Sequence, residues 1–309
     1  NVRAWFRSYP HRQEDALVYN KSGFIWNQAL DHGKTVRIYG EACETEYDRK
    51  LKWLDLYNQY TEGKKPNFKN NSTIARIRPI ISPTFPDCDN IAFSDQQRAD
   101  IFMEEWKRYE QGDSLPNLMV MSLPNDHSAG TSPDFPTPNA MVADNDLAVG
   151  RIVEMISKSK YWDSTVIFIT QDDSQGGWDH ISAYRTVGLA VSAYSTGKLI
   201  TSNYNQTSML RTIEQILGIP PMNIMDATAR LMTDCFQDKI NKTPYQAMPN
   251  NIQLNQMNTP MQSLSGKARK YAKQSQNEVY NEVDGGEDDK MNRIIWFYSK
   301  GNEAYPGGK

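Results

Sequence analysis

The sequence predicts an α/β fold in which a largely parallel sheet is sandwiched between helices. Short continuous apolar runs at residues 117–123, 165–170 and 186–192 alternate with segments of helical periodicity. Such runs are typical of strands buried on both faces of a parallel sheet. With 309 residues, 39% of them hydrophobic, the chain also has enough apolar material for a large core.

The N-terminal part begins with one helix–strand step. Residues 23–33 are predicted to form a short helix that ends at a glycine, and residues 35–39 a strand. Residues 44–93 show little periodicity and include a stretch of loop composition, so we predict a surface excursion there. A helix over residues 94–111 opens with the serine and glutamine of a capping box.

The alternation continues after the first apolar run. A helix is marked around residues 149–156 by apolar residues at positions i, i+3, i+4 and i+7, and it precedes the second run. The third run leads to an amphipathic helix over residues 208–217, which a glycine and a proline end. Each helix can therefore cover one face of the predicted sheet.

We divide the chain into a main domain of residues 1–236 and a helical C-terminal appendage of residues 237–309 that packs on it. The appendage turns rich in Asn and Gln and then carries two helical stretches. The chain begins with Asn1, and its first segment has no hydrophobic signal core, so we expect a trimmed or truncated start.

Composition argues against several classes of partner. A net charge of -3 and a pI near 5.9 give no electrostatic footprint for nucleic acid or an anionic membrane surface. The longest apolar runs are far shorter than the roughly 20 residues that a membrane-spanning helix needs. The three cysteines lie far apart without C-x-x-C spacing, so neither a zinc ribbon nor a disulfide framework is indicated.

Acidic residues and histidines cluster just after two of the predicted strands. They are Asp126 and His127 after the first run, and Asp172, Asp173, Asp179 and His180 after the second. Because parallel strands end at the same edge of a sheet, these side chains are expected to converge. Carboxylate oxygens and imidazole nitrogens are ligands of divalent cations, and a cation relieves the repulsion between adjacent aspartates. The clusters could hold one or two metal ions.

Each of these residues also has an ordinary structural interpretation. Aspartates after strands commonly cap the next helix, and histidines in loops are often simply solvated. The hydroxyls of Ser128, Thr131, Thr170 and Ser174 lie near the clusters, but no G-x-S-x-G elbow surrounds any of them. The residues alone therefore do not identify a nucleophile.

Several long stretches carry a family resemblance. They are residues 23–29, 123–131, 136–151, 172–175 with 179–180, 208–218 and 292–296. Together they resemble the phosphoesterase family that includes bacterial acid phosphatases and phospholipases C, within the alkaline phosphatase superfamily. The resemblance implies an alkaline-phosphatase-like fold and a metal-dependent hydrolase of phosphate mono- or diesters. It also implies two divalent ions, such as zinc, manganese or calcium, and a Ser or Thr nucleophile.

The resemblance assigns roles by order along the chain. Asp172 and Asp173 match the superfamily's Asp-His metal pair, His180 its last ligand histidine, and Asp126 the earlier aspartate ligand. An Asp-Asp pair supplies only oxygen ligands, so it favours metal ions that prefer oxygen. His127 directly follows Asp126 instead of lying one helical turn later, so it is either a ligand or a substrate contact.

Other implications concern what surrounds these residues. Asp179 would orient the His180 ring by contacting it on the side away from the metal. The family's first metal-binding acid and its nucleophile lie upstream of the part that begins with Asn1, so this chain alone would be inactive or completed by a preceding segment. Family members suggest an upstream β-propeller and a periplasmic or secreted location. Two rival functions are a sulfatase or phosphonate hydrolase of the same fold, and a non-catalytic binding module that lacks the nucleophile.

Overall fold

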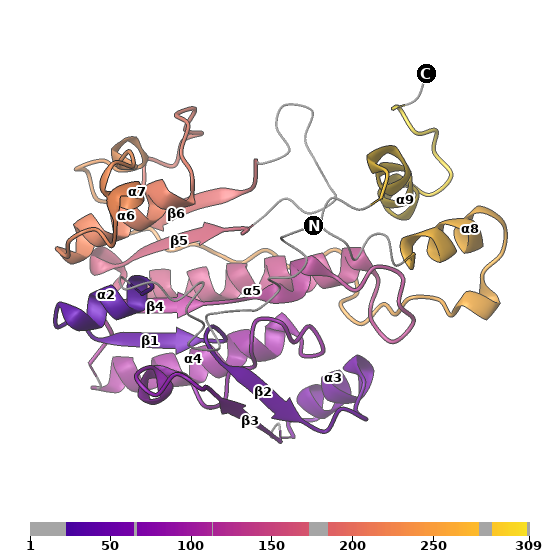
Figure 1. Ribbon diagram of the computed structural model, residues 1–309, viewed down its shortest axis with the longest axis horizontal. Helices are drawn as coiled ribbons and strands as arrows, with labels where there is room; N and C mark the ends of the chain where they lie inside the picture. The colour runs from indigo at the N-terminus through magenta and orange to yellow at the C-terminus, as the bar shows by residue number, and fades with distance from the viewer. Residues whose placement is uncertain (1–22, 65–66, 113, 173–184, 278–285, 308–309) are drawn as a thin grey trace.

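The computed structural model describes residues 23–64, 67–112, 114–172, 185–277 and 286–307 (Figure 1). Helices and strands alternate along much of this chain, which confirms the predicted α/β class. Across the described ranges, none of the helices has both the length and the apolar content that crossing a bilayer requires.

Strands in the described ranges pair two by two. β1 (Val36–Tyr39) pairs in parallel with β4 (Leu118–Met121), β2 (Glu44–Tyr47) antiparallel with β3 (Phe68–Asn71), and β5 (Val166–Thr170) antiparallel with β6 (Gly188–Ser192). Ile81 adds a parallel bridge to Ile38. Among the described strands, the parallel pairing expected for most of the sheet holds for β1 and β4, whereas β6 pairs with β5 in the opposite direction.

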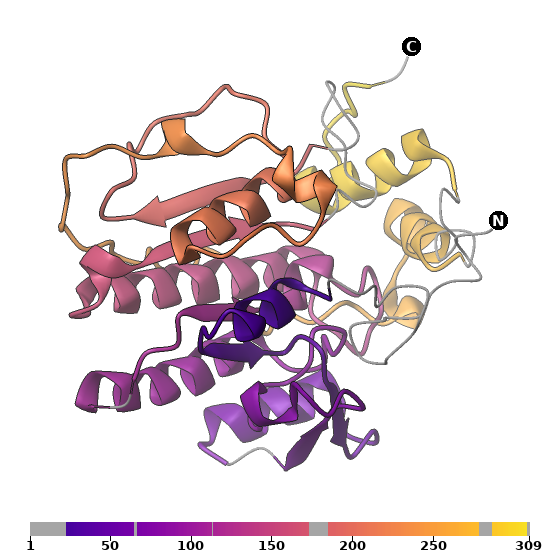
Figure 2. The ribbon, with the colours of Figure 1, turned by 60° about the vertical axis from the view of Figure 1, so that its left-hand side comes forward.

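Two long helices cover one face of these strands. α4 (Asp95–Gln111) and α5 (Pro138–Lys158) pack against each other, and their apolar side chains share one cluster with Met119 and Met121 of β4. Figure 2 shows both helices running along the same side of the strands. Because side chains alternate between the faces of a strand, the neighbouring residues of β4 must point the other way.

The opposite face is covered by two shorter helices. α2 (Ile25–Asp31) and α6 (Gln206–Leu217) contribute to a second cluster, which contains Leu118 and Val120 of β4. Gln28 of α2 donates from Nε2 to the carbonyl of Pro220, 2.8 Å away, just past the end of α6. The strands β1 and β4 are thus enclosed between helices on both faces.

Residues 44–93 are more ordered than a surface excursion. They contain β2, β3, α3 (Trp53–Thr61) and the 3-10 turn η1 (Arg78–Ile80). The prediction was wrong because β3 has only one apolar residue and so lacks a readable pattern. Hydrogen bonds between residues far apart in the chain stabilise this segment instead. Thr45 N donates to Asp87 Oδ2, and Asp87 N donates to Thr45 Oγ1, each at a distance of 2.8 Å.

The helix ends agree with the local sequence. Ser94 caps α4 by accepting from the backbone N of Gln97 at 3.2 Å, as predicted. Thr137 caps α5, which has Pro138 at its first position, so this helix begins well before the apolar stripe that predicted it. α6 ends at Gly218, whose φ of 65° suits a residue without a side chain.

The 3-10 turn η3 (Trp162–Ser164) lies between α5 and β5. The elements that follow α6 are α7 (Ile224–Ala227), α8 (Gly266–Ser275), α9 (Asp288–Lys300), and the 3-10 turns η4 (Thr233–Cys235) and η5 (Met261–Ser263). The side-chain amide of Asn258 donates to the carbonyl oxygens of Gly130 and Ser132, at 3.0 and 2.9 Å. The C-terminal region therefore contacts the loop before α5, while the boundary at residue 236 stays a prediction.

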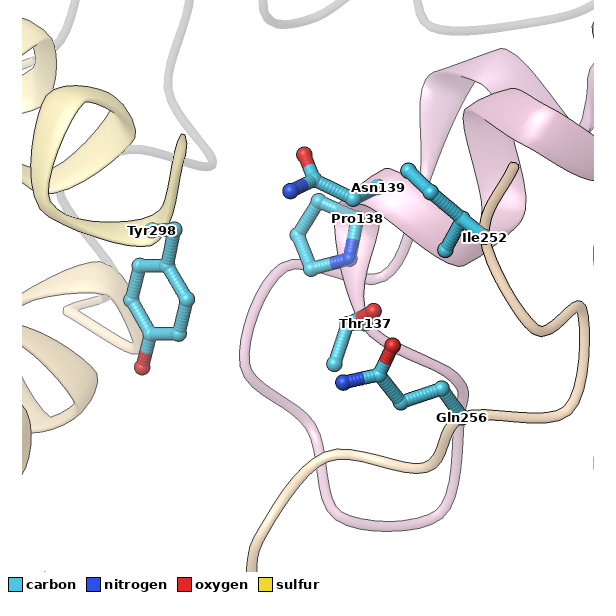
Figure 3. A pocket seen from close by; sticks show the side chains of 6 residues that line it. All are labelled: Thr137, Pro138, Asn139, Ile252, Gln256 and Tyr298. Carbon is cyan, nitrogen blue, oxygen red and sulfur yellow. The ribbon is translucent and has the colours of Figure 1, made fainter. Parts of the chain in front are cut away.

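A hollow lies between the start of α5 and the C-terminal region. It has a volume of about 270 Å³ and is lined by Thr137, Pro138, Asn139, Ile252, Gln256 and Tyr298. Figure 3 shows Tyr298 on the α9 side of the hollow and Pro138 on the α5 side. Its wall includes no Asp, Glu, His or Cys, and it lacks the acidic character expected of the candidate site.

Candidate active site

The loop after β4 carries two of the predicted site residues. The 3-10 turn η2 (Pro124–His127) follows the strand and places Asp126 half-buried and His127 exposed. The Nδ1 atom of His127 lies 3.3 Å from the carbonyl oxygen of Ser128, whose own φ of 56° turns the chain sharply. The turn thus presents both side chains at the carboxyl end of β4.

The loop after β5 meets the loop after β4. Gln171, the residue after the strand, donates from Nε2 to Asp126 Oδ2 at 3.1 Å. Asp172 follows and is exposed, and its carbonyl accepts a hydrogen bond of 2.6 Å from Gln206 Nε2 at the start of α6. The structure therefore brings the loops after β4 and β5 into contact at one edge, through Gln171 and Asp126.

Asn125 holds the loop after β4 in place from the side of the protein core. This residue is fully buried, its backbone N donates to Asp95 Oδ2 at 3.0 Å, and its side-chain Nδ2 donates to Asp144 Oδ2 at 2.6 Å. Asn145 adds bonds from Nδ2 to Asp95 Oδ2 and to the carbonyl of Leu123, at 3.0 and 2.7 Å. The loop that carries Asp126 is thus bonded to the first turns of α4 and to α5.

The two carboxyl groups beneath the loop are unusual because both are buried. Burial raises the pKa of Asp95 to about 7, with Asp144 adding to the rise and the Arg98 guanidinium opposing it. Burial also raises the pKa of Asp144, although its hydrogen bonds from Asp95 N and Asn125 act in the opposite direction. Arg98, itself fully buried, donates from Nη1 to Asp95 Oδ1 at 3.1 Å.

Three of the predicted residues lie outside the described ranges, namely Asp173, Asp179 and His180. In the ranges that are described, no group of three or more His, Cys, Asp or Glu side chains could hold a metal ion. The structure therefore describes three of the five predicted ligands, Asp126, His127 and Asp172.

The hydroxyls near the clusters have different surroundings. Thr131 is buried, and its Oγ1 donates to the carbonyl of Ala272 at 3.2 Å, so its role is to join the loop to α8. Ser128 Oγ accepts from Gly130 N at 3.3 Å, and Thr170 Oγ1 donates to the carbonyl of Gln171 at 2.9 Å. Each hydroxyl has a local structural partner, and Ser174 lies outside the described residues.

Sequence reasoning missed the residues that support the site. Asp144 lies on the buried face of α5, three residues from Met141 and four from Ala148, where an acid interrupts an apolar stripe. That interruption could have identified Asp144 as a structural residue, because an acidic residue in such a position needs a buried partner. Asn125 and Gln171 had no comparable signal, since an amide in a loop is ordinarily solvated.

In open α/β sheets, ligands generally bind at the edge where the carboxyl ends of the strands lie. The model of the Phosphoesterase family matches residues 19–220, which is more than half of the chain. The chain therefore belongs to the Phosphoesterase family. A comparison with curated proteins gives no match.

Proposed function

We propose that this chain is a metal-dependent hydrolase of phosphate esters with an alkaline-phosphatase-like arrangement. Its substrates would be phosphomonoesters, or diesters of the kind that phospholipases C cleave. The observation that carries the proposal is the hydrogen bond from Gln171 to Asp126, which joins the acidic ends of β4 and β5 in a member of the Phosphoesterase family.

The donor chemistry of the two loops fits a divalent cation. Carboxylates are hard oxygen ligands, and a half-buried Asp126 facing an exposed Asp172 loop offers negative charge at a partly desolvated edge. Asp126, Asp172, Asp173 and His180 would hold the metal, two ions in all, with His127 as ligand or substrate contact. Asp179 would orient His180. When bound, the ions would supply electrostatic stabilisation for in-line displacement at phosphorus.

The described residues have positioning roles in this proposal. Gln171 orients the Asp126 carboxylate by occupying Oδ2, which leaves Oδ1 for another partner. Asn125 holds the turn on a buried network, and Gln206 holds the backbone at Asp172. Such preorganisation supports a binding site because little order has to be gained when a ligand arrives. A periplasmic or secreted location remains a prediction from the family resemblance.

The metal part of the proposal is tested by measuring bound metal. We would determine zinc, manganese and calcium in the purified chain by plasma mass spectrometry, alongside D172N and H180A variants. Both variants should lose the metal that the parent retains. D163N is the matched control, because Asp163 lies in η3 and pairs with Lys242 at the surface. A parent that holds no metal after incubation with all three ions would contradict metal binding by this chain.

The reaction is tested by turnover of aryl phosphate, aryl phosphodiester and aryl sulfate. The assay uses the purified chain and a version extended upstream, because the nucleophile is not identified within the chain. Faster turnover of phosphate esters than of sulfate supports the proposal, and the reverse would favour a sulfatase. Metal bound without turnover of any substrate, even in the extended version, would favour a non-catalytic binding module.

A further inference from the structure

One segment of the chain is basic although the protein as a whole is slightly acidic. Residues 239–277 contain six lysines and arginines and no aspartate or glutamate, whereas the whole chain has a net charge of -3. The net charge therefore averages a basic C-terminal segment with a more acidic remainder. Four of the six basic residues lie in α8, namely Lys267, Arg269, Lys270 and Lys273.

One face of α8 packs on the rest of the protein. The carbonyl of Ala272 accepts a hydrogen bond from Thr131 Oγ1 at 3.2 Å, and the ring of Tyr271 packs against Phe297 of α9, with 5.1 Å between the centroids. The buried and half-buried positions have the spacing of one helix face and are Ala268, Tyr271, Ala272 and Ser275. This packing fixes the direction in which the rest of the helix points.

The other side of α8 carries the positive charge. All four of its basic side chains are exposed. Lys267, Lys270 and Lys273 follow one another at intervals of three residues, and Arg269 lies four positions before Lys273, so they are neighbours on the helix surface. We call these four residues the basic face of α8.

Acidic residues in the described part of the chain leave the basic face uncompensated. None of its four side chains forms an ion pair with another described residue. The acids at the start of α9 are paired within that helix, Glu287 with Lys290 at 2.6 Å and Asp289 with Arg293 at 2.7 Å. Because like charges three or four positions apart destabilise a helix, an anionic partner would stabilise α8.

The basic face lies on the side of the molecule where the candidate site lies. Figure 1 shows α8 beyond the ends toward which β4 and β5 point. Thr131, which bonds to α8, follows Asp126 by only five positions. A surface that binds α8 would therefore meet the protein on the side of the acidic loops.

We propose that the basic face of α8 binds the surface of a lipid bilayer that contains anionic phospholipids. Each Lys or Arg close to such a surface strengthens binding roughly fivefold, so four together contribute a factor on the order of 1,000. Lipids move laterally, and each cation on a convex helix can therefore find a headgroup without a shaped groove. The charge complementarity is local to α8 and does not depend on the net charge of the chain.

Nucleic acids and acidic proteins fit the basic face less well. Proteins that bind DNA tightly neutralise about 6–10 phosphates, whereas Lys267 and Lys273 are only about 9 Å apart along the helix. Binding of one particular protein is centred on desolvated aromatic and apolar residues, which the basic face does not contain.

Membrane binding would bring the candidate site close to phospholipid esters. This step rests on the proposed function, since diesters of the kind that phospholipases C cleave lie in bilayers. The membrane binding itself follows from the charge and exposure of α8.

Co-sedimentation with lipid vesicles tests the proposal. We would incubate the purified chain with EDTA at low ionic strength and add vesicles of phosphatidylcholine, alone or mixed in equal parts with phosphatidylglycerol. The chain should pellet with the mixed vesicles and stay in solution with phosphatidylcholine alone. Added salt should release it, because screening shortens the range of the attraction.

A double variant locates the binding surface. K270Q/K273Q removes two charges from the basic face and should bind the mixed vesicles about 30-fold more weakly. K50Q/K69Q is the matched control, because Lys50 and Lys69 are exposed outside α8, and it should bind like the parent. Circular dichroism of both variants checks that a loss of binding is not a loss of helix.

Three results would overturn the proposal. They are no pelleting with the mixed vesicles, equal binding by K270Q/K273Q and the parent, and tighter binding to duplex DNA or polyglutamate than to vesicles at the same charge concentration. The last result would assign the basic face to a nucleic acid or an acidic protein. Vesicle binding is measured with EDTA and without turnover, so failure here is distinct from failure of the proposed function.

Discussion

The loops after β4 and β5 both carry a candidate metal ligand, but the protein supports them very differently. The loop after β4 is bonded through the fully buried Asn125 to two buried carboxylates. The loop after β5 presents Asp172 exposed, with a bond from Gln206 to its backbone rather than to its carboxylate. One half of the site is fixed by the core, and the other lies at the surface.

This difference indicates which half a ligand would have to order. Asp126 keeps its place through backbone and side-chain bonds that are present without a metal. Asp172 is exposed at the surface, where Gln206 at the start of α6 donates to its carbonyl. We therefore expect variants beneath β4 to affect folding, and variants around β5 to affect the site with little effect on folding.

The largest loss of stability is expected from R98M. Arg98 is fully buried, and its guanidinium bonds to Asp95 and to the carbonyls of Phe93, Asp87 and Asn90. Removing one partner of a buried ion pair costs about 3–5 kcal/mol, and in R98M three backbone carbonyls lose their donor as well. Urea denaturation would measure the fall in the free energy of unfolding.

K107M is the matched control for R98M. Lys107 also pairs with an acid three positions earlier on α4, Glu104, but both side chains are exposed. Its free energy of unfolding should change by less than about 1 kcal/mol. A comparably small change in R98M would show that Asp95 does not depend on the guanidinium, and would weaken the contrast between the two loops.

N125L should have the next largest effect. Leucine has nearly the shape of asparagine but removes the donor to Asp144 Oδ2, so a buried carboxylate loses a bond of 2.6 Å. We expect the free energy of unfolding to fall by about 2–3 kcal/mol. N139L, at an exposed position of α5, should shift it by at most about 0.5 kcal/mol. Equal denaturation midpoints for the two variants would contradict an anchoring role for Asn125.

The buried carboxylates also predict how stability depends on pH. Burial raises the pKa of Asp95 to about 7, whereas an unfolded aspartate titrates near 3.9. Between these values the folded state holds a proton that the unfolded state has lost. The contribution of Asp95 is therefore complete below about pH 4 and is lost as the pH rises to about 7, by up to about 1.4 kcal/mol per pH unit.

D95N should flatten this part of the profile. The measurement is the free energy of unfolding from urea titrations at several pH values between 4 and 8, and only its slope is compared. D134N, at an exposed aspartate paired with Lys52, is the control and should keep the parent's slope. If D95N retained the parent's slope, the titration of Asp95 would not be its source.

The sequence predicted most of the elements that position the site. Apolar runs identified β4 and β5, and the serine cap identified the start of α4. It did not predict β2 and β3, because polar strands are stabilised by distant contacts such as that between Thr45 and Asp87. Nor did it predict the antiparallel direction of β6, since an apolar run has the same pattern in either direction.

The sequence identifies the acidic residues of the candidate site but not the residues that hold their loops in place. Asp126 and Asp172 follow apolar runs, and this order along the chain implies a shared sheet edge. The link between them is a side-chain amide, Gln171, whose partner lies 45 positions away in the chain. Such a contact depends on how two loops meet, and no local spacing encodes it.

The smallest effect on stability is expected from Q206A, which tests the exposed half of the comparison. Gln206 donates to the carbonyl of Asp172 at the surface, so its loss should change the free energy of unfolding by less than about 0.5 kcal/mol. Metal retention should nevertheless fall, because the main chain at Asp172 loses the bond from α6. Q215A is the control, since Gln215 is exposed on the same helix, and should alter neither quantity. If Q206A destabilised the fold as strongly as N125L while metal binding stayed intact, the loop after β5 would be a structural element like the loop after β4. Small loss of stability with loss of metal would instead establish that folding and site formation are separable at this edge.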